Sequence, residues 1–178
     1  MFSRIRYRAK QFAHALRAKP TPEGLVAVQR ILTVEEFALF RQMSIGEQAH
    51  AIAVLEDVQM QPWKSPPPRD VWVAALLHDV GKARYPLRLW ERVIIVVAWA
   101  LIPNRVHAWG QQKSVRGWAR PFVIAEQHPV WGAEMAEKAH TSPLACTLIR
   151  RHQDKLSAEV QKAEDQFLRV LQMADNRH

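Results

Sequence analysis

Apolar residues recur at intervals of three and four along most of this chain, which is the spacing that places side chains on one face of an α-helix. The period-two alternation that marks β-strands is nearly absent. Helix starts are signalled by Thr or Ser next to Pro, and by Thr or Ser three residues before Glu. These signals stand at Thr21-Pro22, Thr33 with Glu36, Ser44 with Glu47, and Ser142-Pro143. The pattern predicts an all-α fold, a compact bundle of about eight to ten helices.

Several helix boundaries can be predicted more closely. The pattern indicates a helix from Val71 to about Val80 and a last helix that follows Ser157 and ends at Asp175-Asn176. Another helix is expected to open at His128-Pro129, because the first turn of a helix tolerates proline.

The chain contains one long apolar run, the ten residues from Val93 to Ile102. A helix that crosses a bilayer needs about 20 apolar residues, so this run is too short to span one. We therefore expect a buried helix here. Shallow contact with a membrane, with Trp90 and Trp99 close by, is the alternative.

Two stretches are rich in residues that interrupt helices. Residues 62–68 contain four prolines and are expected to form a loop. Residues 103–121 combine Pro, Gly, Trp and basic residues and are also expected to be irregular. They form either a solvated loop or a flap over an anionic substrate, and so short a basic and aromatic stretch is weak evidence for nucleic-acid binding.

The composition limits the classes of protein to which the chain can belong. A chain of 178 residues, 48% of them apolar, is most simply one globular domain with a single core. The single cysteine, Cys146, excludes an internal disulfide and fits a reducing compartment, so we expect a cytoplasmic protein. Cys146 lies in an apolar run, where a buried and inert thiol is expected.

The net charge of +8 is concentrated at the N-terminus, where six basic residues and no acid fall within the first twenty positions. Apolar residues recur at helical spacing in the same stretch. We expect residues 1–44 to form a basic helical extension, packed on or attached to a domain over residues 45–178. Peripheral contact with an anionic membrane through this basic N-terminus and a transit peptide are the alternatives, and the charge leaves nucleic-acid binding open.

The stretch from Ala75 to Lys82, Ala-Leu-Leu-His-Asp-Val-Gly-Lys, carries the first candidate chemistry. An apolar helical run ends there in adjacent His78 and Asp79, and unpaired buried polar groups are costly. A divalent metal ion would neutralise both groups, and both are good metal ligands. A core His paired with the neighbouring Asp explains the stretch equally well. Lys82 lies four residues after His78, so the two would share a helical face.

The rest of the chain favours the metal. Five helical segments each carry a His or an Asp on or at the end of an otherwise apolar stretch. Several buried imidazoles and carboxylates satisfy one another best around a shared cation. The candidate ligands, in chain order, are His50, His78, Asp79, His128, His152 and Asp175.

The order and local contexts of these residues resemble the HD-domain metal-dependent phosphohydrolase superfamily, over roughly residues 45–178. The segment that begins at His128, His-Pro-Val-Trp-Gly-Ala, is similar to the His-Pro-x-x-Gly-Ala segment of the two-metal members. The other matching segments are Gln48-Ala49-His50, Leu76 to Lys82, Leu148 to His152, and Gln172 to Asn176.

The resemblance implies an HD-domain bundle with two divalent metal ions in its core. His50, His78, Asp79 and Asp175 would hold the first ion, and His128 and His152 the second, with Asp79 bridging. Members with these ligands commonly bind iron or manganese, and others use magnesium, cobalt or zinc. The implied activity is hydrolysis of a phosphate ester or anhydride of a nucleotide-like small molecule by a metal-activated hydroxide. Asp79 and Lys82 would be catalytic, and Lys82 and Arg151 would bind the substrate phosphate.

Two differences from the family pattern narrow the set of members that the chain resembles. The Gly-Tyr-Pro motif of the cyclic-dinucleotide branch does not follow His152, and Arg151 stands in place of the first His of that branch's pair. The pattern is closer to two-metal members that cleave dinucleoside polyphosphates. Two other functions of the same fold stay open, a catalytically weak regulatory or scaffold module and a di-iron oxygenase. Every ligand position is filled, which argues against the scaffold.

Overall fold

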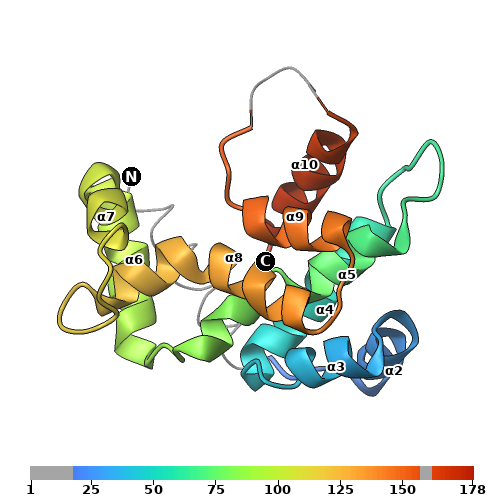
Figure 1. The fold of residues 1–178 in the computed structure, drawn as a ribbon, viewed down its shortest axis with the longest axis horizontal. Coiled ribbons are helices and arrows are strands. Elements are labelled where there is room, and N and C mark those ends of the chain that lie inside the picture. Colours follow the sequence, from blue (N-terminus) through green and yellow to red (C-terminus); the bar gives the residue numbers. More distant parts are fainter. Residues whose placement is uncertain (1–17, 157–161) are drawn as a thin grey trace.

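The computed structural model describes residues 18–156 and 162–178, and every regular element in these two ranges is a helix (Figure 1). The elements are α2 (Pro22–Ile31), α3 (Val34–Phe40), α4 (Ile45–Gln59), α5 (Arg69–Leu77), the 3₁₀-helix η1 (Val80–Arg84), α6 (Leu89–Leu101), α7 (Pro103–Gly110), α8 (Arg120–Lys138), α9 (Pro143–Arg151) and α10 (Ala163–Asp175). The predicted all-α class is confirmed.

The helix starts predicted from Thr and Ser caps are confirmed as well. The Thr21 hydroxyl accepts a hydrogen bond from the backbone N–H of Gly24 at the start of α2. Reciprocal side-chain and backbone bonds form at the starts of α3 and α4, and Ser142 caps α9. Each of these bonds satisfies a backbone donor that has no partner inside its helix. Residues 62–68 are non-helical, as their prolines indicate.

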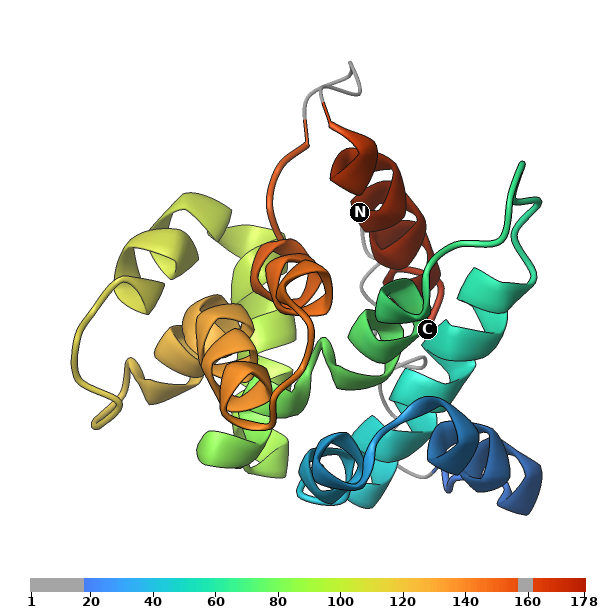
Figure 2. The same cartoon turned by 45° about the vertical axis from the view of Figure 1, so that its right-hand side comes forward.

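A single large core lies around α5, which α4, α9 and α10 contact (Figures 1 and 2). Its largest fully buried side chains include Leu55, Leu76, Leu77, Ile149 and Leu171. Helices α2 and α3 add Val28, Leu39 and Phe40 to the same core, so residues 22–40 pack onto the domain. Residues 1–17, which hold five of the six basic residues counted in the first twenty positions, lie outside the described residues.

Helices α6 and α7 lie at one end of the molecule, and α8 runs from them into the core (Figure 1). The α8 helix contacts α6 and α7 near its start and η1 and α9 further along. None of the helices in the described part of the chain has the length and apolarity that crossing a membrane requires.

Two predicted helix boundaries are wrong. The helix expected to reach Val80 ends at Leu77, and a 3₁₀-helix follows where Gly81 packs against the backbone of α8. The dipeptide His128-Pro129 lies in the middle of α8 instead of opening it. Pro129 has no N–H for the carbonyl of Ala125, and the His128 Nδ1–H donates to that carbonyl instead, at 2.9 Å. The helix therefore continues through the proline.

Two further expectations need correction. Residues 103–121, expected to be irregular, contain α7, whose first turn accommodates Pro103, and only residues 111–119 between α7 and α8 are non-helical. The apolar run Val93 to Ile102 forms α6, as expected, but the helix is not buried. The described residues of α6 include one buried side chain, Glu91, while most of the apolar ones face solvent.

Candidate metal centre

The six predicted ligands converge beside the core, from five different helices. His50 lies on α4, His128 lies in the middle of α8, and the others stand at or just after helix ends. The ligand atoms of five of these residues form two groups, in each of which all the atoms lie within 4.8 Å of one another: His50, His78 and Asp79, and Asp79, His128 and His152. Asp79 belongs to both groups.

Three of the four histidines are oriented by backbone carbonyls. The Nδ1 atom lies 2.9 Å from Ala75 O in His78, 2.9 Å from Ala125 O in His128, and 2.7 Å from Ile149 O in His152. A carbonyl can only accept, so each Nδ1 carries a hydrogen and donates it. Each Nε2 therefore faces the centre, the arrangement that orients metal-binding histidines in proteins.

The Nε2 atoms and carboxylate oxygens are crowded in a way that a cation would relieve. His128 Nε2 lies 3.3 Å from His152 Nε2 and 3.1 Å from Asp79 Oδ1. His78 Nε2 is completely buried and has no hydrogen-bond partner among the described residues. Its nearest acceptors are Asp175 Oδ1 at 3.5 Å and Asp79 Oδ2 at 3.7 Å, beyond good hydrogen-bond distance. This donor set fits a divalent metal.

Asp175 completes the centre on the side of His50. Its Oδ1 lies 2.9 Å from His50 Nε2 and 3.5 Å from His78 Nε2. Because Asp175 is the last residue of α10 and His50 lies on α4, 125 residues earlier, this contact ties the C-terminal helix to the centre.

The charges of the two carboxylates in the centre favour a bound cation. Burial acts to lower the pKa of His78, but Asp79 and Asp175 outweigh it and raise that pKa to about 9. Burial, together with His128 and His78, lowers the pKa of His152 to about 3, so its imidazole is neutral at pH 7. Burial acts to raise the pKa of Asp79, but Lys82 and His78 hold it well below its usual range. Without metal the two carboxylates keep a proton on His78, and a bound metal ion would displace it.

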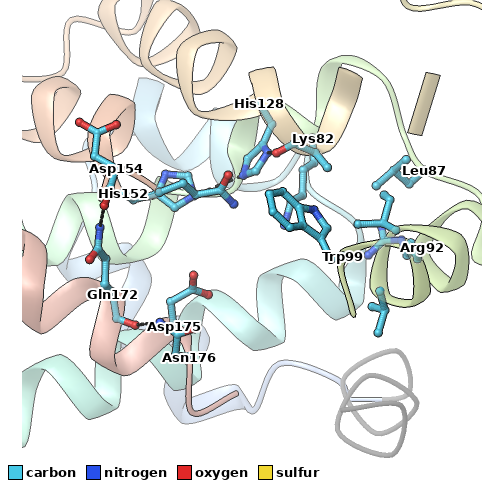
Figure 3. A pocket seen from close by; sticks show the side chains of 14 residues that line it. Lys82, Leu87, Arg92, Trp99, His128, His152, Asp154, Gln172, Asp175 and Asn176 are labelled. Carbon is cyan, nitrogen blue, oxygen red and sulfur yellow. Dashed lines mark hydrogen bonds between the residues drawn. The ribbon is translucent and has the colours of Figure 1, made fainter. Parts of the chain in front are cut away.

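The centre opens into a cavity of about 540 Å³ (Figure 3). His128, His152 and Asp175 line it on the side of the core. Trp99 and Arg92 of α6 line it opposite them, together with Ile95, Val96 and Leu87. The cavity therefore joins a polar floor to a wall that is mostly apolar.

The two predicted phosphate-binding residues differ in their positions. Lys82 lines the cavity, and its Nζ lies 2.5 Å from Asp79 Oδ2. It belongs to η1, not to the helix that ends before His78, so the expected common helical face does not exist. Arg151 is absent from the cavity wall, and its guanidinium contacts Asp154 and Asp165, both at 3.1 Å. Asp154 itself lines the cavity, so Arg151 lies one contact away from it, and its role in substrate binding stays a prediction.

Arg92 is a cation of this cavity that the sequence analysis did not single out. Its guanidinium lies 2.6 Å from Glu47 Oε1, and its side chain is 18% exposed. A charged residue at the border of an apolar run is usually a solvated boundary marker. The signal that could have identified it is its spacing of seven residues from Trp99, which places both on one side of a helix.

Comparison with known protein families matches residues 43–178 to the HD domain. Neither the curated proteins nor the solved structures gave a significant match. The matched region begins just before α4 and contains all six side chains of the candidate centre. Proteins with this domain bind divalent metals, and the fold is that of metal-dependent hydrolases. The chain belongs to the HD-domain family.

Proposed function

We infer that this protein is a metal-dependent phosphohydrolase that cleaves a phosphate ester or anhydride of a nucleotide-like small molecule. The observation that carries the inference is the sharing of Asp79 by two His-containing groups, next to a cavity that His128, His152 and Lys82 line. Paired metal sites of this kind are typical of enzymes that displace groups at phosphorus.

The donor set indicates which residues would hold which ion. His50, His78, Asp79 and Asp175 would hold one divalent ion, and Asp79, His128 and His152 would hold a second. Mixed imidazole and carboxylate ligands suit iron, manganese, cobalt or zinc better than magnesium, which prefers oxygen ligands. When bound, such ions lower the pKa of a water molecule and polarise a phosphoryl oxygen.

The protein's own cations are placed for the phosphate of the substrate. Lys82 brings a positive charge to the cavity next to Asp79. Arg92 enters from the opposite wall, and a guanidinium can donate two parallel hydrogen bonds to a phosphate. Trp99, on the same wall, offers a ring on which a nucleobase can stack. A nucleotide would thus have its phosphate at the polar floor and its base against α6.

The test combines metal analysis with a panel of phosphate substrates. Elemental analysis of the purified protein is expected to find a transition metal, and a panel of mononucleotides and dinucleotides to yield metal-dependent phosphate release. Asp79→Asn should abolish turnover and lower the metal content while circular dichroism stays helical. Glu137→Gln is the matched control, because Glu137 forms an exposed ion pair with Arg150 and neither residue lines the cavity.

Three other results of these experiments would contradict the proposal, and two of them would favour another function of the same fold. Unchanged turnover in Asp79→Asn would rule out the hydrolytic mechanism. Bound metal without turnover of any substrate in the panel would favour the regulatory module. Turnover that requires dioxygen would favour the di-iron oxygenase.

A further inference from the structure

The outer side of α6 is an apolar surface, here called the α6 face, formed by Leu89, Trp90, Val93, Ile94, Val97 and Leu101. Each of these side chains is between 41% and 61% exposed. Leu89, Val93, Val97 and Leu101 are four residues apart, and Trp90 and Ile94 lie beside them, so the six form one continuous strip along the helix. An exposed apolar strip of this size on a water-soluble domain usually marks an interaction surface.

The arrangement of α6 differs from that of an ordinary surface helix, because apolar residues lie on its exposed side as well as on the side that lines the cavity. Such a helix buries its apolar stripe and exposes its polar one. In α6 the polar residues Glu91 and Arg92 face inward, where Glu91 pairs with Arg120 and Arg92 pairs with Glu47. These two ion pairs hold the side of the helix that carries Glu91 and Arg92 against the domain, and the apolar strip stays exposed.

The surroundings of the α6 face are strongly basic. Residues 84–120 contain seven Lys and Arg residues but a single acid, Glu91, which is buried. Arg105, Lys113 and Arg116 are exposed and form no ion pair with any described residue. They belong to α7 and the loop after it, at the same end of the molecule as α6 (Figure 1). Trp118, in that loop, is 64% exposed.

We propose that the α6 face docks on the surface of an anionic lipid membrane, with the helix lying in the interface. Apolar side chains would enter the boundary between headgroups and acyl chains, and the three unpaired cations would meet anionic headgroups. Trp90 and Trp118 suit this position, because tryptophan is enriched at membrane–water interfaces. With 13 residues, α6 is long enough to lie on the membrane but not to cross it.

A second copy of this chain is the competing occupant, and the charge disfavours it. A two-fold dimer through the α6 face would place the same surface against itself. The basic surroundings of the two copies would then lie close together, and like charges across an interface are repelled. An anionic membrane complements the same charge. The proposal does not depend on the proposed catalytic function, since none of the six residues of the α6 face lines the cavity.

Vesicle sedimentation with the full chain tests the proposal. The protein is expected to bind vesicles of phosphatidylcholine with phosphatidylglycerol at low salt and to be released from them by high salt. It is expected to bind vesicles of phosphatidylcholine alone much more weakly. The double variant Val93→Gln, Val97→Gln should weaken binding at least about tenfold, because it removes two side chains that would be buried in lipid. The matched control is Val34→Gln with Met60→Gln, two exposed apolar residues on other elements. It should bind as the wild type does.

Analytical ultracentrifugation of the same proteins decides between the two occupants. A monomer that binds anionic vesicles through the α6 face supports the proposal. A dimer that dissociates in the Val93→Gln, Val97→Gln variant and binds no vesicles would overturn it in favour of a second copy. Equal vesicle binding by that variant and the wild type, or equal binding to neutral and anionic vesicles, would also overturn it.

Discussion

Gly81 lies directly against the backbone of His128. A Cβ atom at position 81 would stand 2.0 Å from the His128 carbonyl oxygen and 2.6 Å from the backbone nitrogen of Gly132. Neither neighbour is a flexible side chain, so η1 reaches α8 this closely only with glycine. The contact places Asp79 and Lys82, on either side of Gly81, next to the imidazole of His128.

Gly81→Ala should therefore separate η1 from α8 and disturb both metal groups at once. Overpacking a closely packed contact costs about 1 to 3 kcal/mol, so the free energy of unfolding should fall by that amount. The metal content of the purified protein should fall with it, because Asp79 belongs to both groups. Thermal unfolding and elemental analysis measure the two effects. An unchanged melting temperature would contradict the close approach.

The proline within α8 provides a second test. Because Pro129 cannot donate to the Ala125 carbonyl, the His128 Nδ1–H has that acceptor available. Pro129→Ala restores the backbone donor, which would compete with His128 for the carbonyl. We expect a higher melting temperature, since proline in a helix interior is unfavourable. We also expect metal affinity to fall by about tenfold, a typical cost of losing a hydrogen bond that orients a ligand.

Pro121→Ala is the matched control for this change. Pro121 lies in the first turn of the same helix, where proline removes no helical hydrogen bond. The control should neither raise the melting temperature nor weaken metal binding. If Pro129→Ala behaves in the same way as the control, then His128 does not depend on the Ala125 carbonyl for its orientation.

The sequence predicted the six candidate ligands because each stands in or beside an apolar segment, where a polar residue requires a specific partner. The helix starts were predictable for a similar reason, since their caps are bonds between residues three positions apart. The continuation of α8 through Pro129 could not be predicted in this way. A proline within a helical pattern usually marks a boundary, and here a side-chain bond from the preceding histidine replaces the missing backbone bond.

The orientation of α6 and the identity of the basic residues that line the cavity both depend on tertiary packing. A wholly apolar run predicts a helix, but the direction of its faces is decided by Glu91 and Arg92, whose partners are distant in sequence. Lys82 and Arg151 are both close in sequence to candidate ligands, but only Lys82 lines the cavity, while Arg151 pairs with Asp154 and Asp165. Sequence proximity to a ligand therefore identified one of the two cations that line the cavity and missed Arg92.

The pairing of Glu91 with Arg120 should make stability depend on pH in the acid range. The Arg120 guanidinium lies 2.5 Å from both oxygens of this buried carboxylate. Burial acts to raise the Glu91 pKa, but the bonds from Arg120 and from the Arg88 N–H lower it below its ordinary value of 4.5. A depressed pKa stabilises the folded state above pH 4.5, and this contribution is lost as the pH falls from there through the folded-state pKa.

Glu91→Gln should accordingly destabilise the protein at pH 7 by about 2 kcal/mol, the order of a hydrogen bond to a charged group. It should also reduce the loss of melting temperature between about pH 5 and pH 3. Glu134→Gln serves as the control, because Glu134 forms an exposed ion pair with Arg84 and such pairs contribute little. Equal pH profiles for the Glu91→Gln variant and the wild type would show that the buried pair does not hold α6.

Arg92 and Arg151 offer a direct comparison of two cations near the centre. If Arg92 binds the substrate phosphate across the cavity, Arg92→Gln should lower kcat/KM by about tenfold or more, the cost of one charged hydrogen bond. The effect should fall mainly on KM, and the metal content should not change, because Arg92 belongs to neither metal group. Arg151→Gln removes the same charge from a residue that does not line the cavity and is paired with Asp154 and Asp165, so KM should stay at the wild-type value. Steady-state kinetics on whichever nucleotide the panel identifies measures both variants. A larger KM effect in Arg151→Gln than in Arg92→Gln would reverse the assignment and place the substrate phosphate on the side of α9.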